Sequence, residues 1–536
     1  MTETASHTTS TVALLENLVG ASRASTPQLF EARVRKSPHA NFLRYQGRLW
    51  TYAQAWDVIG RYASQFMELN RGSAAFRVAS FLSNRPEALW AWFGTHAAGG
   101  VYVALNRSHR GDLLRDVLKR SGANVLLTES SALDVLPELD ECGIEFGILC
   151  EDDAAPHSPG FTVLTTAGIE ARDRAYAPDP APSDLATIMF TSGTTGRSKA
   201  VRIPHNMLCR GGARVAEALG FRETDVVHLW MPLCHIAGQL HHTMATIAAG
   251  GSLALYPTFS ASRFWSQVKE SSATVFCGLP NILNILSNRE PHPDDGKTTL
   301  RLGIVGILPP ALHSAFEERF GVRLIDSYGM TECEPLTLPA PDAPSPAGSC
   351  GKAAPDFEIA IVDDEDIRLP SGKTGEIVVR PRVPDVMMQG YEEDSVATVR
   401  LWRNLWWHTG DLGYKDKHEF IFVLGRKKHM IRRRGENISA WELEVTLSKH
   451  PAIEECAALG VPSPLGEDDV KTVLKLKQGA NFEQDNFIRF CKENMASFMI
   501  PRFVEFRQSF PVNDVGKVDK LKLVEFEGEF WDLDPR

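Results

Sequence analysis

The chain has 536 residues, of which 43% are hydrophobic and 23% charged, and its formal net charge is −10. This composition excludes a disordered or fibrous protein, and the length predicts about two to four globular domains. The acidic balance argues against a nucleic-acid partner, because non-specific affinity for a duplex comes mainly from an excess of Lys and Arg.

The N-terminal segment does not resemble an export signal. It contains an early glutamate, Glu3, and has no Lys or Arg before Arg23. Because the first twenty or so residues are rich in Thr, Ser and Ala, we expect them to form a loose tail. No stretch reaches about 18 apolar residues without a polar interruption, which argues against integral membrane association. We therefore expect a cytoplasmic protein.

Short apolar runs alternate with helical patterns after this tail. The runs at 76–82, 100–105 and 123–128 predict strands, and the patterns at 86–98 and 111–121 predict helices. Alternation of this kind is typical of α/β layers with largely parallel sheets.

The second part of the chain continues the same alternation after an interruption. Residues 151–184 contain several Pro, Ala and Asp and are interpreted as a connector. From 225 to 305 the α/β pattern returns, with strands expected at 252–256 and 274–277 and a helix at 261–270.

The pattern of apolar and polar residues changes after residue 350. The segment "FEIAIVDDEDIRLPSGKTGEIVVR" (357–380) alternates apolar and polar residues around turn signals, which predicts antiparallel hairpins. A shorter α/β pattern follows from 441 to 523. We therefore expect a domain boundary between Leu424 and His429.

A loop rich in glycine and hydroxyl groups, "TSGTTGRSK" (191–199), follows the apolar run 185–190. Its glycines would expose backbone N–H groups to an anion, and its hydroxyls and terminal lysine would add further donors. No glycine directly precedes the lysine, so the loop is not that of a P-loop NTPase. Alone, such a loop is more often a flexible turn than a site. The candidate phosphate-binding residues are Thr191, Ser192, Gly193, Thr194, Thr195, Gly196 and Lys199.

Four further motifs follow this loop in order: "DSYGMTECEP" (326–335), "WHTGDLGY" (407–414), "GRKKHMIRRRGENIS" (425–439) and "PVNDVGKVDK" (511–520). Together the five motifs resemble the core motifs of the adenylate-forming (ANL) superfamily, which comprises acyl- and aryl-CoA synthetases, luciferases and peptide-synthetase adenylation domains. The resemblance spans residues 25 to 525. Segments 259–265, 318–332 and 488–506 are most similar to the carnitine or crotonobetaine CoA-ligase branch.

The resemblance implies an α/β fold with two domains. The large N-terminal domain (1–424) would consist of stacked α/β sheets plus a small β-barrel-like part, and the small C-terminal α/β domain (425–536) would be a mobile lid. The implied reaction uses ATP, Mg²⁺ and coenzyme A. A carboxylate attacks the α-phosphorus of ATP and expels pyrophosphate, and the CoA thiolate then displaces AMP from the acyl adenylate.

The motif matches assign candidate roles in adenylate formation. Lys517 would bridge the attacking carboxylate and the α-phosphate, where cationic compensation aids catalysis; outside this motif, a solvated surface lysine is the simpler interpretation. Thr331 and Glu332 would contact the α-phosphate and hold Mg²⁺, a hard cation that prefers oxygen ligands. Tyr328 would stack on adenine with Asp326 near its edge, although a tyrosine after an apolar strand is ordinarily a core residue.

A second group of matches concerns the ribose and the step with CoA. Asp411 is suited to accept hydrogen bonds from both ribose hydroxyls, and Arg426 would reach the same region; the plain alternative for Asp411 is a turn aspartate. For thioester formation the small domain would rotate about Lys428, so that the loop with Gly435 and Glu436 replaces Lys517. Many relatives have Asp where this chain has His429.

The acid pocket is expected around "MPLCHIAGQ" (231–239), where His235 would line or gate it, with Gly278 and Gly306 at nearby strand ends. Many family members have Gly-Gly-Ala-Pro where this chain has Ile304 to Ile307. These bulkier residues favour a small or compact acid. If the carnitine-like resemblance extends to the substrate, Trp230 and Trp265 could face a quaternary ammonium group, although both are more often core residues.

Two other functions are compatible with the sequence. A free-standing adenylation enzyme would load a carrier protein, and a non-catalytic protein would only bind adenylates; retention of Lys517, Glu332 and Asp411 argues against the second. The basic run at 426–434 could also be a patch that binds nucleic acid or an anionic surface, although its place at the expected hinge favours contact with the phosphates of ATP or CoA. Because the nine cysteines never form a C-x-x-C pair, neither a zinc site nor a disulfide framework is expected. The sequence leaves monomer and homodimer open.

Overall fold

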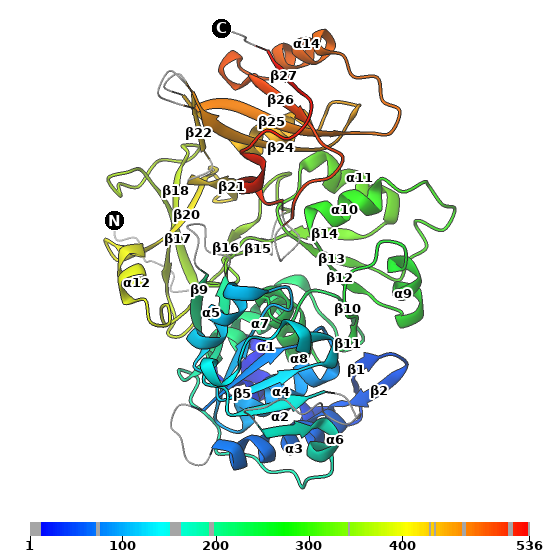
Figure 1. The fold of residues 1–536 in the computed structure, drawn as a ribbon, viewed down its shortest axis with the longest axis vertical. Coiled ribbons are helices and arrows are strands. Elements are labelled where there is room, and N and C mark those ends of the chain that lie inside the picture. Colours follow the sequence, from blue (N-terminus) through cyan, green and yellow to red (C-terminus); the bar gives the residue numbers. More distant parts are fainter. Residues whose placement is uncertain are drawn as a thin grey trace, which may run out of the picture.

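The computed structural model describes residues 12–70, 76–150, 162–191, 198–340, 344–427, 430–433, 436–463, 468–512 and 518–533. Two seven-stranded sheets, one five-stranded sheet and one four-stranded sheet form its framework, and two further pairs of strands complete it (Figure 1). No helix in these ranges is long and apolar enough to cross a membrane. All nine cysteines lie in these ranges, and no disulfide joins them.

The first seven-stranded sheet has the order β7-β6-β5-β3-β4-β8-β9. All its pairs are parallel except β8 with β9. Its strands are β3 (Arg77–Phe81), β4 (Val101–Ala104), β5 (Val125–Thr128), β6 (Phe146–Leu149), β7 (Thr162–Thr165), β8 (Leu185–Thr191) and β9 (Lys199–Pro204).

The second seven-stranded sheet has the order β14-β13-β12-β10-β11-β1-β2, and only the edge pair β1 and β2 is antiparallel. Its strands are β1 (Asn41–Tyr45), β2 (Arg48–Thr51), β10 (Val226–Leu229), β11 (Ser252–Leu255), β12 (Val275–Gly278), β13 (Leu302–Val305) and β14 (Arg323–Asp326). The largely parallel sheets expected from the alternating pattern are confirmed.

Helices pack against both sheets to form one large apolar core. Adjacent residues of β3 show the division between the two faces of its sheet: Val78 joins this core, and Ala79 joins a smaller cluster with α5. The helices of this part are α1 (Ala13–Val19), α2 (Thr26–Lys36), α3 (Tyr52–Asn70), α4 (Pro86–Ala97), α5 (Gly111–Ser121), α6 (Thr166–Glu170), α7 (His205–Leu219), α8 (Ala245–Ala249), α9 (Phe264–Ser271), α10 (Pro280–Ser287) and α11 (Pro310–Phe320), with a π-helix, η3 (Ala237–Met244).

Two segments differ from the sequence-based expectation. Within the expected N-terminal tail, residues 13–19 form α1, because the buried Leu15 joins the main core and Glu217 accepts a hydrogen bond from the Leu14 amide at 2.6 Å. Within the expected connector 151–184, β7 adds a parallel edge strand to β6 and α6 follows it. Both segments are held by contacts with residues that are distant in the chain.

The hairpins expected after residue 350 form the five-stranded antiparallel sheet, with the order β17-β18-β20-β19 and β21 paired to β20. Its strands are β17 (Phe357–Val362), β18 (Gly375–Pro381), β19 (Trp402–Arg403), β20 (Trp406–Lys415) and β21 (Ile421–Arg426). Helix α12 (Ser395–Leu401) and the pair β15 (Thr337–Leu338) and β16 (Lys352–Ala353) accompany it. This sheet corresponds to the expected β-barrel-like part.

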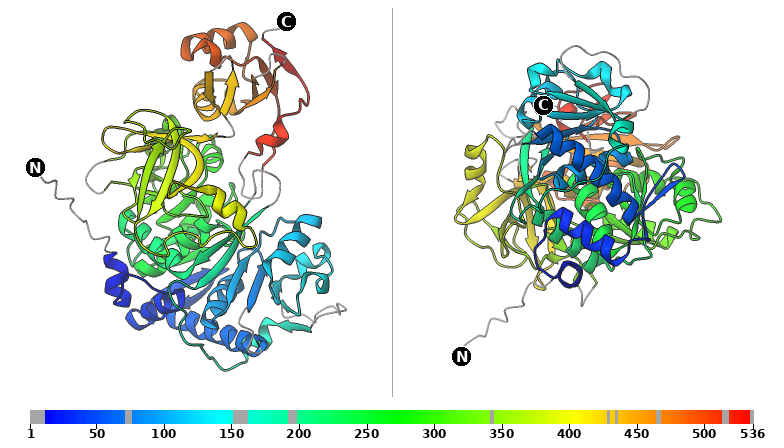
Figure 2. Two further views of the ribbon diagram at one scale, coloured as in Figure 1. Left: turned by 90° about the vertical axis from the view of Figure 1, so that its left-hand side faces the viewer. Right: turned by 90° about the horizontal axis from the view of Figure 1, so that it is seen from below.

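A smaller C-terminal part lies at one end of the long axis (Figure 1, orange to red; Figure 2, left). It has apolar clusters of its own, which include Leu443, Phe487 and Val504. Its elements are β22 (Met430–Arg433), β23 (Glu436–Ser439), α13 (Ala440–Leu447), β24 (Ile453–Pro462), β25 (Asp468–Leu476), α14 (Gln484–Asn494), β26 (Phe503–Phe506) and β27 (Phe530–Asp532), with 3₁₀ turns at Ser497–Met499 and Lys520–Leu523.

Candidate active site

The candidate acid and nucleotide residues gather along one edge of the second sheet. Gly278 ends β12, Gly306 follows β13, and Asp326 ends β14. The Gly306 amide donates a hydrogen bond to the Gly278 carbonyl at 3.3 Å, and His235 lies in the segment after the neighbouring β10. The carboxyl ends of parallel strands are the usual location of ligand sites in α/β sheets.

Three residues from separate motifs meet near this edge. The Tyr328 hydroxyl donates to Oδ2 of Asp411 at 2.8 Å, and Nε of Arg426 lies 2.7 Å from Oδ1 of the same carboxylate. Burial, assisted by the Asp411 charge, raises the pKa of Tyr328 well above its usual value, so the phenol stays protonated as a donor. Both Asp411 oxygens therefore have protein partners. A ribose hydroxyl would have to share one of these oxygens with its protein partner or displace that partner.

Asp326 lies two residues before Tyr328, and its side chain is 9% exposed. Its Oδ1 accepts a hydrogen bond from the Leu308 amide at 2.9 Å, and its Oδ2 lies 3.4 Å from Nε2 of His313. Burial raises the pKa of Asp326 to about 6, while the Leu308 amide and His313 act in the opposite direction. This carboxyl therefore titrates close to neutral pH.

Glu332 is half-buried and is held by a residue that the sequence motifs did not indicate. The Tyr391 hydroxyl donates to Oε1 of Glu332 at 2.7 Å, and Nζ of Lys199 lies 4.6 Å from the centroid of the Tyr391 ring. Tyr391 thus connects the lysine that ends the glycine loop with the carboxylate of the "YGMTE" motif. No spacing in the sequence relates these three segments, so only the fold could identify Tyr391.

Some of the candidate residues lie outside the described ranges. Thr191 ends β8 and pairs with Lys199 at the start of β9, so the glycine loop is the connection of an antiparallel pair. Val512 and Val518 form an antiparallel bridge at the two ends of the segment that contains Lys517. Glu436 is described only as a β23 backbone position opposite Arg433. Those outside are Ser192, Gly193, Thr194, Thr195, Gly196, Lys428, His429, Gly435 and Lys517.

His235 and the two candidate tryptophans have mainly structural contacts. Nδ1 of the half-buried His235 accepts a hydrogen bond from the Ala237 amide at 3.1 Å, at the start of η3. Trp230 is buried and donates through Nε1 to the Cys277 carbonyl at 2.9 Å. Trp265 packs against Phe320, with ring centroids 4.7 Å apart. Trp230 is therefore a core residue, whereas Trp265 is partly buried beside the core, and the suggested ammonium-binding role stays a prediction.

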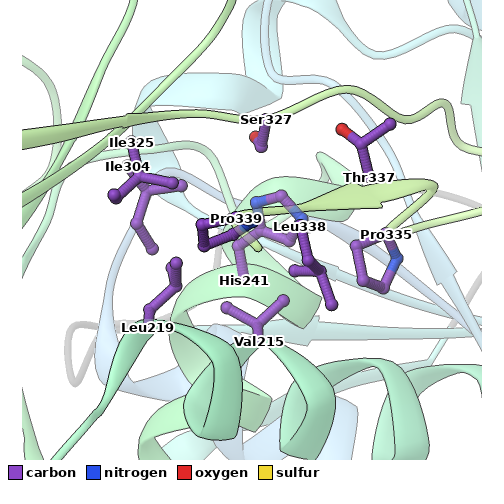
Figure 3. A pocket seen from close by; sticks show the side chains of 10 residues that line it. All are labelled: Val215, Leu219, His241, Ile304, Ile325, Ser327, Pro335, Thr337, Leu338 and Pro339. Atoms are coloured by element: carbon purple, nitrogen blue, oxygen red, sulfur yellow. The ribbon is translucent and has the colours of Figure 1, made fainter. Parts of the chain in front are cut away.

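A small cavity lies behind the strand ends (Figure 3). His241 of η3 lines it, and Nε2 of His241 lies 2.8 Å from Oε1 of the buried Glu334. A Cβ at Gly329 would lie 2.2 Å from this carboxylate, so the motif glycine allows Glu334 to approach the backbone. The sequence motifs did not indicate His241 or Glu334 as site residues.

Comparisons with known proteins agree with this arrangement. Residues 30–392 match the AMP-binding enzyme family, and residues 442–517 match the AMP-binding enzyme C-terminal domain. The crotonobetaine/carnitine–CoA ligase of Shigella flexneri is 32% identical over 484 residues, which cover 88% of this chain and 93% of that relative.

Two solved structures with the same fold cover nearly the whole chain. ATP-bound MatB from Rhodopseudomonas palustris has a TM-score of 0.82 and 25% identity, covering 96% of this chain and 98% of its own. The o-succinylbenzoate coenzyme A synthetase MenE from Bacillus subtilis, in complex with AMP, has a TM-score of 0.78 and 25% identity, covering 94% and 99%. Because the family match extends over more than half of the chain, the protein belongs to the adenylate-forming AMP-binding enzyme family.

Proposed function

We propose that the protein is an ATP-dependent acid–CoA ligase that acts through an acyl adenylate on a small or compact carboxylic acid. The observation that carries this proposal is the meeting of Tyr328, Asp411 and Arg426 at the carboxyl ends of parallel strands. Its relatives include named CoA ligases, and MenE was solved with AMP.

In this proposal the strand-end residues hold the nucleotide. Asp411 accepts hydrogen bonds from the ribose hydroxyls after Arg426 yields one carboxylate oxygen, and Tyr328 forms one wall of the adenine site. Thr191, Thr331, Lys199 and the glycine loop (192–197) surround the phosphates. Donors around the phosphates would stabilise the charge that develops on the α-phosphate during the reaction.

Glu332 is the residue that would hold Mg²⁺ with the phosphates of ATP. A bound Mg²⁺ would neutralise phosphate charge during the displacement of pyrophosphate. Among the described residues, no group of three or more His, Cys, Asp or Glu could hold a metal alone. This fits Mg²⁺, which commonly takes one or two carboxylates and completes its shell with phosphate and water oxygens. Tyr391 would fix the orientation of this carboxylate through its hydrogen bond to Oε1.

The two half-reactions would use different positions of the C-terminal domain. We place the hinge at Lys428, because β21 of the five-stranded sheet ends at Arg426 and the next strand begins at Met430; the expected boundary after Leu424 lies two residues before the end of β21. Lys517 would serve adenylation, and Gly435 and Glu436 would then line the path of the CoA thiol. A cytoplasmic location is part of the same proposal.

Pyrophosphate release tests the proposed function. The wild-type protein is incubated with MgATP and a panel of small carboxylates, with and without CoA. We expect at least one acid to release pyrophosphate and to yield AMP and a CoA thioester in equal amounts. Transfer to a phosphopantetheinyl carrier instead of CoA would favour the carrier-loading enzyme, and no release with any acid would contradict catalysis.

The raised pKa of Asp326 predicts a pH-dependent KM for ATP. If its carboxylate accepts a hydrogen bond from the adenine amino group, protonation below about pH 6 removes the negative charge and leaves a weaker, neutral acceptor. KM for ATP should then rise roughly tenfold as the pH falls from 7 to 5. Asp326→Asn keeps an acceptor oxygen and should flatten the profile. The nucleotide titrates in the same way with the wild type and with Asp326→Asn, so the ratio of the two KM values for ATP reports Asp326 alone. A ratio that stays constant between pH 5 and 7 would refute this role.

A further inference from the structure

Helix α12 and the hairpin that follows it present a group of apolar side chains to solvent. Val396 and Val399 of the helix are 60% and 68% exposed. Leu405, in the turn between β19 and β20, is 77% exposed, and Ile367 is 63% exposed. These are four of the five most exposed large apolar side chains in the described ranges, so their clustering is not the usual scatter of single apolar residues over a surface.

These side chains form one patch. The two valines are three positions apart and are therefore neighbours on the helix surface. Helix α12 packs against β19, which begins with the 36% exposed Trp402. Oδ2 of Asp366, next to Ile367, accepts a hydrogen bond at 2.8 Å from Nδ2 of Asn404, next to Leu405. We define the α12 patch as Ile367, Val396, Val399, Trp402 and Leu405.

The α12 patch lies at the margin of the molecule. Helix α12 is at the left edge of Figure 1 and faces the viewer in the left view of Figure 2. None of the five side chains is a candidate nucleotide, acid or hinge residue, so the proposed reaction does not explain their exposure. A contiguous apolar patch on a protein surface is typical of an interaction site.

The two ends of α12 carry charges of opposite sign. Glu393 and Asp394 precede the first turn, where the Asp394 side chain caps the helix, and Arg400 lies in the last turn. Glu393 and Arg400 are exposed, and neither takes part in an ion pair with any other described residue. The helix therefore has an acidic end, an apolar middle and a basic end.

A second copy of the same helix complements this arrangement when the two helices run antiparallel. A two-fold axis across the middle of α12 places the acidic end of each copy opposite the basic end of the other copy. The same axis brings the valines of the two copies together. Antiparallel neighbours also place opposite ends of the two helix dipoles side by side.

We propose that the protein forms a two-fold dimer through the α12 patch, with α12 of one copy antiparallel to α12 of the other. The apolar side chains supply the affinity, and the two pairs of Glu393 with Arg400 set the direction of the helices. Trp402 is an aromatic residue of the kind that anchors interfaces. Because one short helix and two turns make an interface at the small end of the usual range, we expect a dissociation constant of about 1 to 10 µM.

Sedimentation velocity of the full chain, from about 0.1 to 100 µM, tests this dimer. The wild-type mass should rise from that of one chain to that of two. Val399→Asp places a charge in the centre of the patch and should weaken association by at least about tenfold, because the charge would be buried without a partner. Leu113→Asp, at a 39% exposed apolar position of α5, is the matched control and should associate like the wild type.

Charge reversal tests the antiparallel direction. Glu393→Arg alone and Arg400→Glu alone each place like charges opposite one another across the interface. Each should weaken association by at least about tenfold. The double variant exchanges the two partners and should restore the dissociation constant to within about threefold of the wild-type value.

Each outcome decides one part of the inference. A wild-type protein that stays monomeric at every concentration would overturn the dimer. Wild-type association in a folded Val399→Asp protein would place the contact outside the α12 patch, and a double variant without rescue would overturn the antiparallel arrangement. A monomeric wild type that sediments with phosphatidylcholine vesicles, and no longer does so in Val399→Asp, would assign the patch to a membrane surface instead.

Discussion

Replacing Lys517 by alanine should abolish adenylate formation while the protein still converts a supplied acyl adenylate and CoA into thioester. The expected loss in the first half-reaction is about 10²- to 10³-fold, the typical effect of removing a group that stabilises developing transition-state charge. The second half-reaction should fall by less than about threefold, because in this scheme Lys517 has left the site when the thiolate attacks the carbonyl and AMP departs as the leaving group. Pyrophosphate release and thioester formation from synthetic adenylate measure the two steps separately.

The neighbouring Lys522 provides the matched control. Its side chain is 66% exposed, and Nζ lies 3.5 Å from Oδ2 of Asp519. Lys522→Ala therefore deletes a solvent-exposed lysine in the same C-terminal part of the chain. This variant should keep both half-reactions within about twofold of wild type, as expected for an exposed surface substitution. An equal loss in both half-reactions of a folded Lys517→Ala protein would contradict the use of Lys517 in one step only.

The sequence predicts those elements whose apolar pattern is strong. The buried run at 76–82 and the helical pattern at 86–98 correspond to β3 (Arg77–Phe81) and α4 (Pro86–Ala97) within one or two residues. Strand β7 and helix α1 were missed because they are short and lie in longer stretches interpreted as a connector and a tail. Their stability comes from an edge pairing and from contacts with α7. Neither source of stability is local in the chain.

For the candidate site, the motifs indicated single residues, whereas the contacts between them became visible only in the fold. The motifs indicated Tyr328, Asp411 and Arg426 individually. Arg426 meets Asp411 as its cross-strand partner in the five-stranded sheet, and the Tyr328–Asp411 hydrogen bond joins that sheet to the segment after β14. The motifs did not predict Tyr391 or Glu334 as site residues, because each is identified only by a hydrogen-bond partner far along the chain. The partner of Tyr391 is Glu332, and the partner of Glu334 is His241. A lone tyrosine or glutamate has no spacing that would reveal such a partner.

The sheet that carries Asp411 is attached to the core by a buried ionic cluster. Arg210 and Arg214 lie one turn apart on α7 and therefore on one face of the helix. Nη2 of Arg210 donates to Oδ1 of Asp356 at 2.8 Å, and Nη2 of Arg214 donates to the same oxygen at 3.0 Å. Asp356 directly precedes β17 and its side chain is 5% exposed, so one carboxylate compensates two largely buried guanidinium groups.

Asp356→Ala should therefore lower the free energy of unfolding by about 3–5 kcal/mol, because it removes the buried carboxylate between the two guanidinium groups; Glu217, 3.7 Å from Arg214, is the more exposed second carboxylate. Asp356→Asn keeps the acceptor oxygen and should cost less. Urea unfolding followed by tryptophan fluorescence measures both, since Trp406 and Trp407 lie in the affected sheet. Asp112→Ala, which breaks the exposed pair with Arg115, is the control and should leave the urea midpoint unchanged. If Asp356→Ala unfolds at the same urea concentration as this control, the cluster does not attach the sheet. A lower midpoint accompanied by a raised KM for ATP would show that the same attachment also positions Asp411.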